Sequence, residues 1–397
     1  MKRALVVAFV VVLLALNASS EFISLVAANF TPLPELPTPI YIRADGNVEP
    51  FTAPIQRTGN VYTLTGDINN TVEVQLSDMV LDGDGFVITK PSIETGGLMM
   101  PVGWLPGVDV NGVSNVAIRN LVFEGCITGV RVENASGVIV RENIIRDTLS
   151  GIAVFSSSEV NITGNDIALS SESFATGINF LPTDPSSYDP HHIVIEGNRI
   201  AGNSSEVPTQ PPQPEQYGIW GGFSYSTLSA NVFRAIKGIG LYYTGSNNLI
   251  VGNSFQGSYE GVFFTGSAEL SVNSIFYGNN FEGNSKNVVV PYIRNPPANF
   301  WDNGTIGNFW SDYSGVDVNG DGVGDSPYIL ETVYFDYDLN HDVTVQEGVD
   351  HFPLMAPLDL SGSSPEPTIP EFTSWMITPL FMLVALTVIA FHFKKRK

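Results

Sequence analysis

The sequence contains a single cysteine, Cys126, so an intramolecular disulfide framework is excluded. Cys126 stands in a largely apolar stretch, residues 123–127, which predicts a small buried residue. Basic residues are also scarce: 18 Lys and Arg stand against 40 Asp and Glu, and the formal net charge is −22. A surface this acidic repels the phosphates of nucleic acids, so we expect no nucleic-acid partner.

Long helical patterns are missing from the body of the chain, and the long apolar runs lie at its two ends. Lys2 and Arg3 precede an apolar run over residues 4–16 that ends in small residues, which predicts a secretory signal peptide over residues 1–20. An uncleaved anchor helix is the alternative, although the run is short for a full span. Cleavage is compatible with three positions: after Ala18, Ser20 or Ala28.

The C-terminal apolar run, residues 375–393, has 19 residues without Asp, Glu, Lys or Arg, and the basic residues 394–397 follow at once. A run of this length predicts a transmembrane helix, and the basic cluster predicts a cytoplasmic tail. We therefore expect a membrane-anchored cell-surface protein whose body lies outside the cytoplasm. A buried core helix is the alternative.

An internal repeat dominates the middle of the chain. An Asn followed two residues later by an apolar residue recurs at spacings of 23, 22, 33, 33, 22 and 26 residues. A unit of about 22 residues is typical of one coil of a β-solenoid. The Leu framework of leucine-rich repeats is absent. The repeated asparagines are Asn120, Asn143, Asn165, Asn198, Asn231, Asn253 and Asn279.

Each unit also carries short runs with apolar residues at alternate positions, several of them opened by glycine, as at Gly129, Gly151 and Gly177. This pattern predicts short strands with one buried face. One coil cannot bury that face alone, but stacked coils pair every strand and close a core. We therefore predict an all-β fold, a right-handed parallel β-helix. A β-sandwich of hairpins is the alternative. The inward residues should be Ile145, Ile167, Ile200, Phe233, Phe255 and Phe281.

The remaining segments complete the predicted organisation. A polar insertion over residues 203–216 interrupts the repeats, and such insertions often flank a binding surface. The predicted parts are a stalk (21–40), lead-in strands with the first coils (41–104), the β-helix repeats (105–300), an acidic cap (301–358) and a Pro-rich linker (359–374) before the transmembrane helix (375–393) and the tail (394–397).

Three segments after the repeats carry a family resemblance. They read Gly-Asn-Phe-Trp-Ser-Asp-Tyr over residues 307–313, Asp-Val-Asn-Gly-Asp-Gly-Val-Gly-Asp-Ser-Pro-Tyr over 317–328, and Asp-His-Phe-Pro-Leu-Met over 350–355. Over residues 40–356 the chain resembles the NosD-like right-handed β-helix proteins, named for a periplasmic copper-binding maturation factor. The Pro-Glu-Phe at 370–372 resembles an archaeal sorting signal.

The resemblance implies a copper-binding maturation factor, but the donor residues argue against copper. Copper favours thiolate, thioether or imidazole ligands. Outside the terminal segments the chain has one Cys, one Met pair at residues 99–100, and four histidines without a His-x-His cluster. The histidines are His191, His192, His341 and His351.

The acidic cap carries a candidate calcium loop. Residues 295–393 hold 14 acidic residues and no Lys or Arg. Within them, side-chain oxygens recur at the first, third, fifth and ninth positions of a loop with Gly at the sixth, as in an EF-hand, although Tyr328 replaces the bidentate Glu at the twelfth. A second run over residues 336–347 has related spacing but lacks the Gly. The predicted calcium ligands are Asp317, Asn319, Asp321, Asp325 and the carbonyl of Val323.

An outward face of the solenoid is the candidate ligand surface. Aligning the glycine-initiated strands places Arg131, Ala153, Asn179, Trp220, Gly240 and Phe263 in one outward row, and Glu133, Phe155, Leu181, Gly222, Tyr242 and Thr265 in a second. Aromatic side chains on such a face stack on sugar rings, or they simply pack against one another. The predicted ligand-binding residues are Trp220, Tyr242, Phe263, Phe155 and Asn179.

Two functional classes follow. The chain is a surface protein that binds carbohydrate or a partner protein, or it is a polysaccharide-active enzyme, a lyase or glycoside hydrolase, on the same scaffold. A glycosidase requires two carboxyl groups at a fixed separation, and Asp147, Asp166 and Glu196 come from different coils. We therefore name no catalytic residues.

Overall fold

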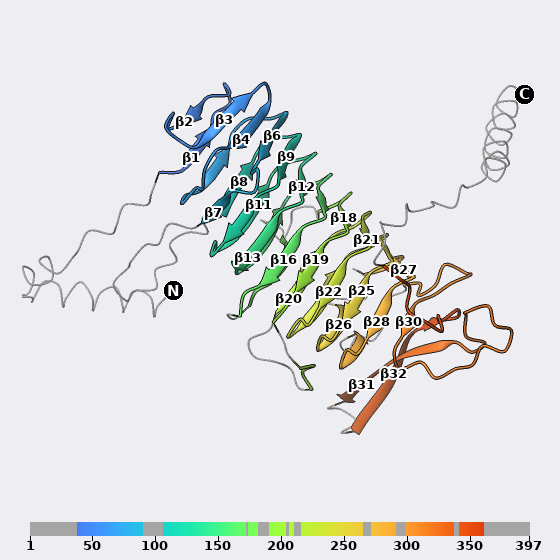
Figure 1. Cartoon of the computed structure of the whole chain (residues 1–397). Coiled ribbons are helices and arrows are strands. Elements are labelled where there is room, and N and C mark those ends of the chain that lie inside the picture. The colour runs from blue at the N-terminus through green and yellow to red at the C-terminus, as the bar shows by residue number, and fades with distance from the viewer. Residues whose placement is uncertain are drawn as a thin grey trace, which may run out of the picture. The chain divides into compact units, whose positions relative to one another are not determined.

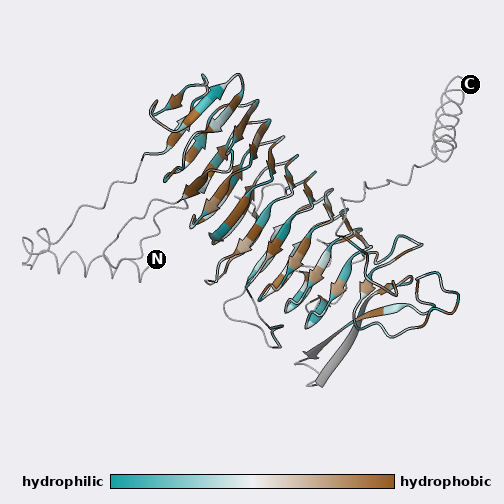
Figure 2. Cartoon of the chain, viewed as in Figure 1, coloured by the Kyte–Doolittle hydropathy of each residue, from teal (hydrophilic) through white to brown (hydrophobic). Residues whose placement is uncertain are grey.

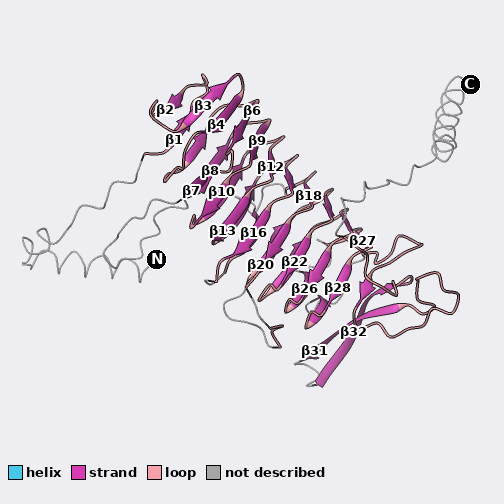
Figure 3. Ribbon diagram, in the orientation of Figure 1, coloured by secondary structure: helices cyan, strands magenta, loops and turns pink. Residues whose placement is uncertain are grey.

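A computed structural model describes the chain over residues 38–89, 106–171, 174–181, 190–203, 206–209, 216–264, 271–290, 299–336 and 341–360. Within these ranges the protein is a solenoid of short stacked strands (Figures 1 and 3). The predicted signal peptide, stalk and transmembrane helix lie outside the described residues. No helix among the described residues is long and apolar enough to cross a membrane.

Three sheets form the walls of the solenoid, and each coil contributes one strand to each sheet. Neighbouring strands pair in parallel throughout the repeats, while the two strand pairs at the start, over residues 40–49 and 55–64, are antiparallel. This arrangement confirms the predicted parallel β-helix.

The sheets are named here by their order along the axis. Sheet I is β2 (Val48–Glu49), β1 (Ile40–Ile42), β5 (Val72–Val74), β8 (Pro106–Asn111), β11 (Thr128–Glu133), β14 (Ser150–Phe155), β17 (Thr176–Leu181), β20 (Tyr217–Gly222), β23 (Ile239–Thr244), β26 (Glu260–Phe264) and β29 (Lys286–Val289). Sheet II is β7 (Val87–Thr89), β10 (Val122–Glu124), β13 (Ile144–Thr148), β16 (Asp166–Leu169), β19 (Arg199–Ala201), β22 (Val232–Arg234), β25 (Ser254–Gln256), β28 (Asn280–Glu282) and β30 (Phe309–Trp310). Sheet III is β3 (Ile55–Thr58), β4 (Val61–Leu64), β6 (Met79–Asp82), β9 (Val116–Arg119), β12 (Ile139–Arg141), β15 (Asn161–Thr163), β18 (Val194–Glu196), β21 (Thr227–Ser229), β24 (Leu249–Val251) and β27 (Ile275–Tyr277).

The core is a set of rows of like side chains that run along the axis. Figure 2 shows apolar residues recurring from strand to strand. The six inward residues predicted from the repeats form one such row on sheet II. They are in register and fully buried, and the row changes from isoleucine to phenylalanine after Ile200. Phe255 stacks on Phe281 with ring centroids 5.1 Å apart, and Trp310 continues the stack at 4.4 Å. Cys126 is buried, as predicted.

A ladder of buried asparagines lies at the corner before sheet II. Each member after Asn143 accepts, through Oδ1, the backbone N–H of the asparagine one coil earlier; Asn198 N donates to Asn231 Oδ1 at 2.9 Å, for example. Each Nδ2 in turn donates to a carbonyl of the preceding coil, as Asn231 does to Ile195 at 2.8 Å. The ladder therefore satisfies polar groups that would otherwise be buried without partners. Its members are Asn143, Asn165, Asn198, Asn231, Asn253, Asn279 and Asn308.

Asn120, the first of the repeated asparagines, does not belong to this ladder. Val122 pairs with Ile144, so Leu121 takes the ladder position, and the N–H of Leu121 donates to Asn143 Oδ1. Asn120 lies one residue earlier, where φ is +54°. Asparagine tolerates this left-handed backbone well, which explains its presence there without a buried ladder.

The cap ends the ladder with a carboxylate. Asp350, at the end of the hairpin β31 (Tyr328–Asp336) and β32 (His341–Asp350), is fully buried, and its Oδ2 accepts the N–H of Asn308 at 2.7 Å and Trp310 Nε1–H at 2.9 Å. Burial raises the pKa of Asp350 above its usual range, against the opposing effect of these hydrogen bonds. Gly307 lies against the carboxylate, where a Cβ would clash.

Candidate functional site

An outward row on sheet I brings together most of the residues predicted to bind ligand. Strand register places one residue of each coil in this row, with inward-facing residues on both sides. Charged residues occupy its N-terminal half and aromatic residues its C-terminal half. The row runs Glu73, Asp109, Arg131, Ala153, Asn179, Trp220, Tyr242, Phe263 and Val289.

The predicted position of Tyr242 is wrong by one row. Sequence alignment on Gly238 put Gly240 beside Trp220, whereas the structure pairs Trp220 with Tyr242. The reason is that Gly218 lies beside Gly240 in the stack, not beside Gly238. Tyr242, two residues after Gly240, therefore lies beside Trp220 in the first row. Phe155 lies in the second row beside Glu133, as predicted.

The aromatic residues of the row pack against one another. Tyr242 and Phe263 have ring centroids 5.3 Å apart and planes 5° apart, so each covers one face of the other. Trp220 is tilted by 46° against Tyr242 at 6.2 Å. A sugar ring needs an open aromatic face for stacking. Trp220, at the end of the aromatic half, is therefore a better platform than Tyr242.

Asn179, the neighbour of Trp220 in the row, has an unsatisfied acceptor. Its side chain is only 7% exposed, and among the described residues no donor reaches its Oδ1. Ala153 precedes it in the row and is also buried. A buried amide oxygen without a donor costs about 1–3 kcal/mol, so this position is suited to a hydroxyl donor from a ligand.

A charged cluster adjoins Ala153 on the other side. Arg131 donates from Nε to Asp109 Oδ1 at 2.9 Å and from Nη2 to Oδ2 at 2.7 Å, and Glu133 lies 3.7 Å from the guanidinium. Burial by itself would lower the pKa of Arg131, but the hydrogen bonds and charge of Asp109 outweigh it and raise that pKa. Arg131 therefore stays charged, and both oxygens of the Asp109 carboxylate are engaged in this ion pair.

The carboxylates considered for glycosidase chemistry do not gather. Asp166 lies on sheet II, where it forms an ion pair with Arg199 at 3.0 Å. Glu196 lies on sheet III, and Asp147 lies at a left-handed corner of β13. These residues do not form a glycosidase pair.

The predicted calcium loop is a compact, exposed turn in the cap. Asp317 Oδ1 accepts the N–H of Gly320 at 2.7 Å, and its Oδ2 accepts the N–H of Gly322 at 2.9 Å. Asp321 Oδ1 accepts the N–H of Val323, and Asp325 Oδ2 accepts the N–H of Val318. In this geometry the described residues contain no group of three or more His, Cys, Asp or Glu that could hold a metal ion.

A comparison with known protein families identifies the family to which the chain belongs. A family model described as "Periplasmic copper-binding protein (NosD)" matches residues 60–315, which include the sheet I row and most of the stack. The chain belongs to the NosD family.

Two NosD relatives match part of the chain. The probable ABC transporter binding protein NosD of Stutzerimonas stutzeri is 31% identical over 145 residues, which are 32% of this chain and 30% of the relative. That of Pseudomonas aeruginosa is 33% identical over 129 residues, 29% of each protein. The matches thus span less than a third of the length of these relatives.

Solved structures show weaker similarity. The alginate lyase of Paenibacillus sp. str. FPU-7 has a TM-score of 0.36 at 15% identity, over 59% of this chain and 91% of the lyase. The Streptococcus pneumoniae surface protein and adhesin PfbA has a TM-score of 0.32 at 11% identity, over 65% of this chain and 79% of PfbA.

The described residues of this NosD protein do not fit a copper centre. Cys126 is buried, with its sulfur 3.6 Å from the carbonyl of Ile88. His351 Nδ1 lies 2.9 Å from Asp302. His191 and His192 approach each other at 2.8 Å through their Nδ1 atoms, but no third His, Cys, Asp or Glu among the described residues completes a site. The Met pair at 99–100 lies outside the described residues.

Two residues were not predicted from the sequence. They are Asp109, which forms an ion pair with Arg131, and Asp350, which ends the asparagine ladder. Asp109 stands between two valines in an alternating strand, and this signal identifies an outward position. Nothing local identifies Asp350 as buried, because its partners Asn308 and Trp310 are 40 or more residues away.

Proposed function

We propose that this NosD protein is an extracytoplasmic carbohydrate-binding protein, and that a sugar binds on sheet I in the stretch from Arg131 to Trp220. The observation that supports this most is the buried, unpartnered Oδ1 of Asn179. The family description, a periplasmic protein, supports a location outside the cytoplasm.

The chemistry of the stretch matches a sugar. Trp220 supplies an aromatic surface for the C–H face of a pyranose ring. Asn179 supplies an acceptor for a hydroxyl group, and the buried Ala153 beside it in the row adds only a methyl group. Arg131 is held in place by Asp109 and offers its remaining N–H groups as donors.

Calorimetric titration with oligosaccharides selected on a glycan array tests this proposal. Asn179→Ala and Trp220→Ala should each weaken binding by roughly 5–150-fold, because each removes about 1–3 kcal/mol of interaction. Asn161→Ala and Tyr277→Ala are the matched controls, since both residues lie on the outward face of sheet III. Equal losses in the controls, or unchanged binding by Asn179→Ala, would refute the site.

A polysaccharide-active enzyme is the second candidate. The observation that favours it is the cluster of Asp109, Arg131 and Glu133 on adjacent coils of the same sheet. Product analysis of each bound oligosaccharide after long incubation separates the two functions. Cleavage that is lost in Asp109→Asn would establish the enzyme, whereas intact oligosaccharide supports binding alone. A protein partner on the same face is the remaining alternative.

The cap loop is proposed to bind calcium through Asp317, Asn319, Asp321, Asp325 and the Val323 carbonyl. Its support is the EF-hand-like spacing together with a backbone already folded around the Asp317 carboxylate. The loop is tied to the end of the solenoid, because Gly324 N–H donates to the Pro353 carbonyl at 2.8 Å and Met355 N–H to the Gly322 carbonyl at 3.0 Å. Calcium should therefore stabilise this end of the protein.

Thermal unfolding with calcium or with chelator, at fixed ionic strength, tests the loop. At free calcium of 100 times the dissociation constant, linkage adds about 2.7 kcal/mol. Asp321→Ala should remove that difference, while Glu331→Ala, an exposed carboxylate of the cap outside both acidic runs, is the control. If the midpoint of thermal unfolding does not change up to millimolar calcium, the loop is a hydrogen-bonded turn that binds no calcium.

Membrane anchoring by residues 375–393 and processing at residues 370–372 remain predictions, because both segments lie outside the described residues. Protease treatment of intact cells should remove the body of the protein and spare a tag on residues 394–397. Protection of the body would refute the proposed topology.

A further inference from the structure

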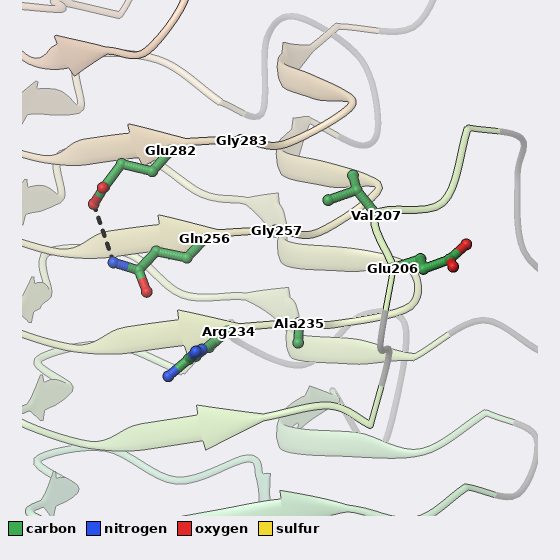
Figure 4. Close-up of a pocket in the computed structure, with 8 residues that line it drawn as sticks. All are labelled: Glu206, Val207, Arg234, Ala235, Gln256, Gly257, Glu282 and Gly283. Atoms are coloured by element: carbon green, nitrogen blue, oxygen red, sulfur yellow. Dashed lines mark hydrogen bonds between the residues drawn. The ribbon is translucent and has the colours of Figure 1, made fainter.

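A groove lies at the ends of three strands of sheet II, away from the sheet I row. It is an open groove of about 490 Å³ between the ends of β22, β25 and β28 and the segment of residues 206–209 (Figure 4). This segment belongs to the polar insertion that interrupts the repeats. The lining residues are Glu206, Val207, Arg234, Ala235, Gln256, Gly257, Glu282 and Gly283.

Small residues at three successive corners make room for the groove. Ala235, Gly257 and Gly283 all have left-handed backbones, with φ of 54°, 61° and 60°. Val207 lies over the middle corner, with Cγ2 3.9 Å from the point that a Cβ on Gly257 would occupy. The hydroxyl of Ser285 donates to the carbonyl of Pro208 and fixes the segment to the stack.

Three polar side chains stand side by side on the floor of the groove. Arg234, Gln256 and Glu282 are register partners in successive coils, so their backbones are about 4.8 Å apart. Gln256 Nε2 donates to Glu282 Oε1 at 3.0 Å, which leaves Gln256 Oε1 as an acceptor. The floor of the groove therefore presents one cationic hydrogen-bond donor, Arg234. Two acceptors, Gln256 Oε1 and the Glu282 carboxylate, follow it on the next two coils. Figure 4 shows the Glu206 carboxylate pointing away from this row.

Arg234 differs from most of the described arginines of this acidic protein. Among the described residues it takes part in no ion pair, whereas Arg119, Arg131 and Arg199 on other strands each hold an aspartate. Its guanidinium is exposed to the groove and is available for an anionic ligand.

We propose that this groove binds a carboxylate-bearing sugar, a uronic acid residue. The carboxylate pairs with the guanidinium of Arg234, which matches its planar geometry. The sugar hydroxyls donate to Gln256 Oε1 and to the Glu282 carboxylate one and two coils further on. A pyranose ring carries its carboxylate and hydroxyl groups at separations comparable to this coil spacing.

The charge pattern selects against other ligands. A phosphate or sulfate dianion places two negative charges on one group beside the Glu282 carboxylate and is repelled, whereas each ring of a uronic acid oligosaccharide carries a single carboxylate. A neutral sugar can use the two acceptors but leaves Arg234 without its anionic partner. One carboxylate with several hydroxyls satisfies the whole row.

Calorimetric titration of the purified full chain with digalacturonate and with its neutral counterpart, galactobiose, tests the proposal. We expect digalacturonate to bind roughly 10–100-fold more tightly, the effect of a charge-assisted hydrogen bond. Arg234→Gln should remove that preference. Arg146→Gln is the matched control: it occupies the same outward row three coils earlier, about 14 Å away, and also forms no ion pair among the described residues.

The outcomes separate this groove from the sheet I site. Trp220→Ala should weaken neutral oligosaccharides alone and leave digalacturonate binding unchanged. Equal affinity for the two disaccharides, or an equal loss in Arg146→Gln, overturns the proposal. Displacement of digalacturonate by acetate at equal concentration also overturns it, since the groove would then be a simple anion site.

Discussion

Removal of one rung of the asparagine ladder should destabilise the protein far more than removal of a surface asparagine. Asn231 is fully buried, and its Nδ2 donates to the carbonyls of Ile195 and Ser229 and to Asn253 Oδ1, at 2.8, 2.9 and 2.9 Å. Its Oδ1 accepts the backbone N–H of Asn198 at 2.9 Å. Alanine at this position removes all of these bonds.

The magnitude follows from the groups left behind. The buried N–H of Asn198 loses its acceptor, which costs about 1–3 kcal/mol, and each lost bond donated by Nδ2 adds about 0.5–1.5 kcal/mol. We expect Asn231→Ala to lower the free energy of unfolding by at least about 3 kcal/mol. Since a domain is stable by only about 5–15 kcal/mol, this is a large fraction of the total.

Urea denaturation followed by circular dichroism measures the effect. Asn120→Gly is the control, because Asn120 lies at the left-handed corner outside the ladder and its side chain donates only to Asp82, at 3.0 Å. We expect the control to change the free energy of unfolding by less than about 1 kcal/mol. Similar losses in both variants would show that the ladder contributes no special stability.

Three further predictions concern the core and the cap. Phe255→Ala should cost about 3–5 kcal/mol by thermal or urea unfolding, because it leaves a cavity between Phe233 and Phe281; a cost below about 1 kcal/mol would contradict the stacked core. Gly307→Ala should destabilise the protein more than Gly66→Ala, since a Cβ at Gly307 meets the Asp350 carboxylate whereas a Cβ at Gly66 comes no closer than 3.5 Å to another side chain; equal melting temperatures would contradict this. The raised pKa of Asp350 means that its contribution to stability is full below the ordinary value of 3.8 and is lost as the pH rises through the raised pKa. Relative to Asp350→Asn, the wild type should therefore lose stability as the pH increases above 3.8, and a parallel pH dependence of the two proteins would refute it.

The sequence by itself determined the parallel β-helix, because each coil carries its own short strands and its own apolar positions. Ile145, Ile167 and Phe255 could be assigned to the core from local alternation alone, and the repeat then required stacking. The same local pattern placed Trp220, Asn179 and Phe155 on the outward face of sheet I. Periodicity is a property of neighbouring residues, and a sequence displays it directly.

Only the tertiary structure decided the exact register between coils. A displacement of two residues moved Tyr242 beside Trp220, and a displacement of one removed Asn120 from the ladder, because insertions and corners change the number of residues per coil. The groove at Arg234 depends on side chains 22 to 48 residues apart and on an insertion that folds back over them. Asp350 is buried by partners 40 or more residues away. These contacts form between coils, so no pattern within a single coil records them.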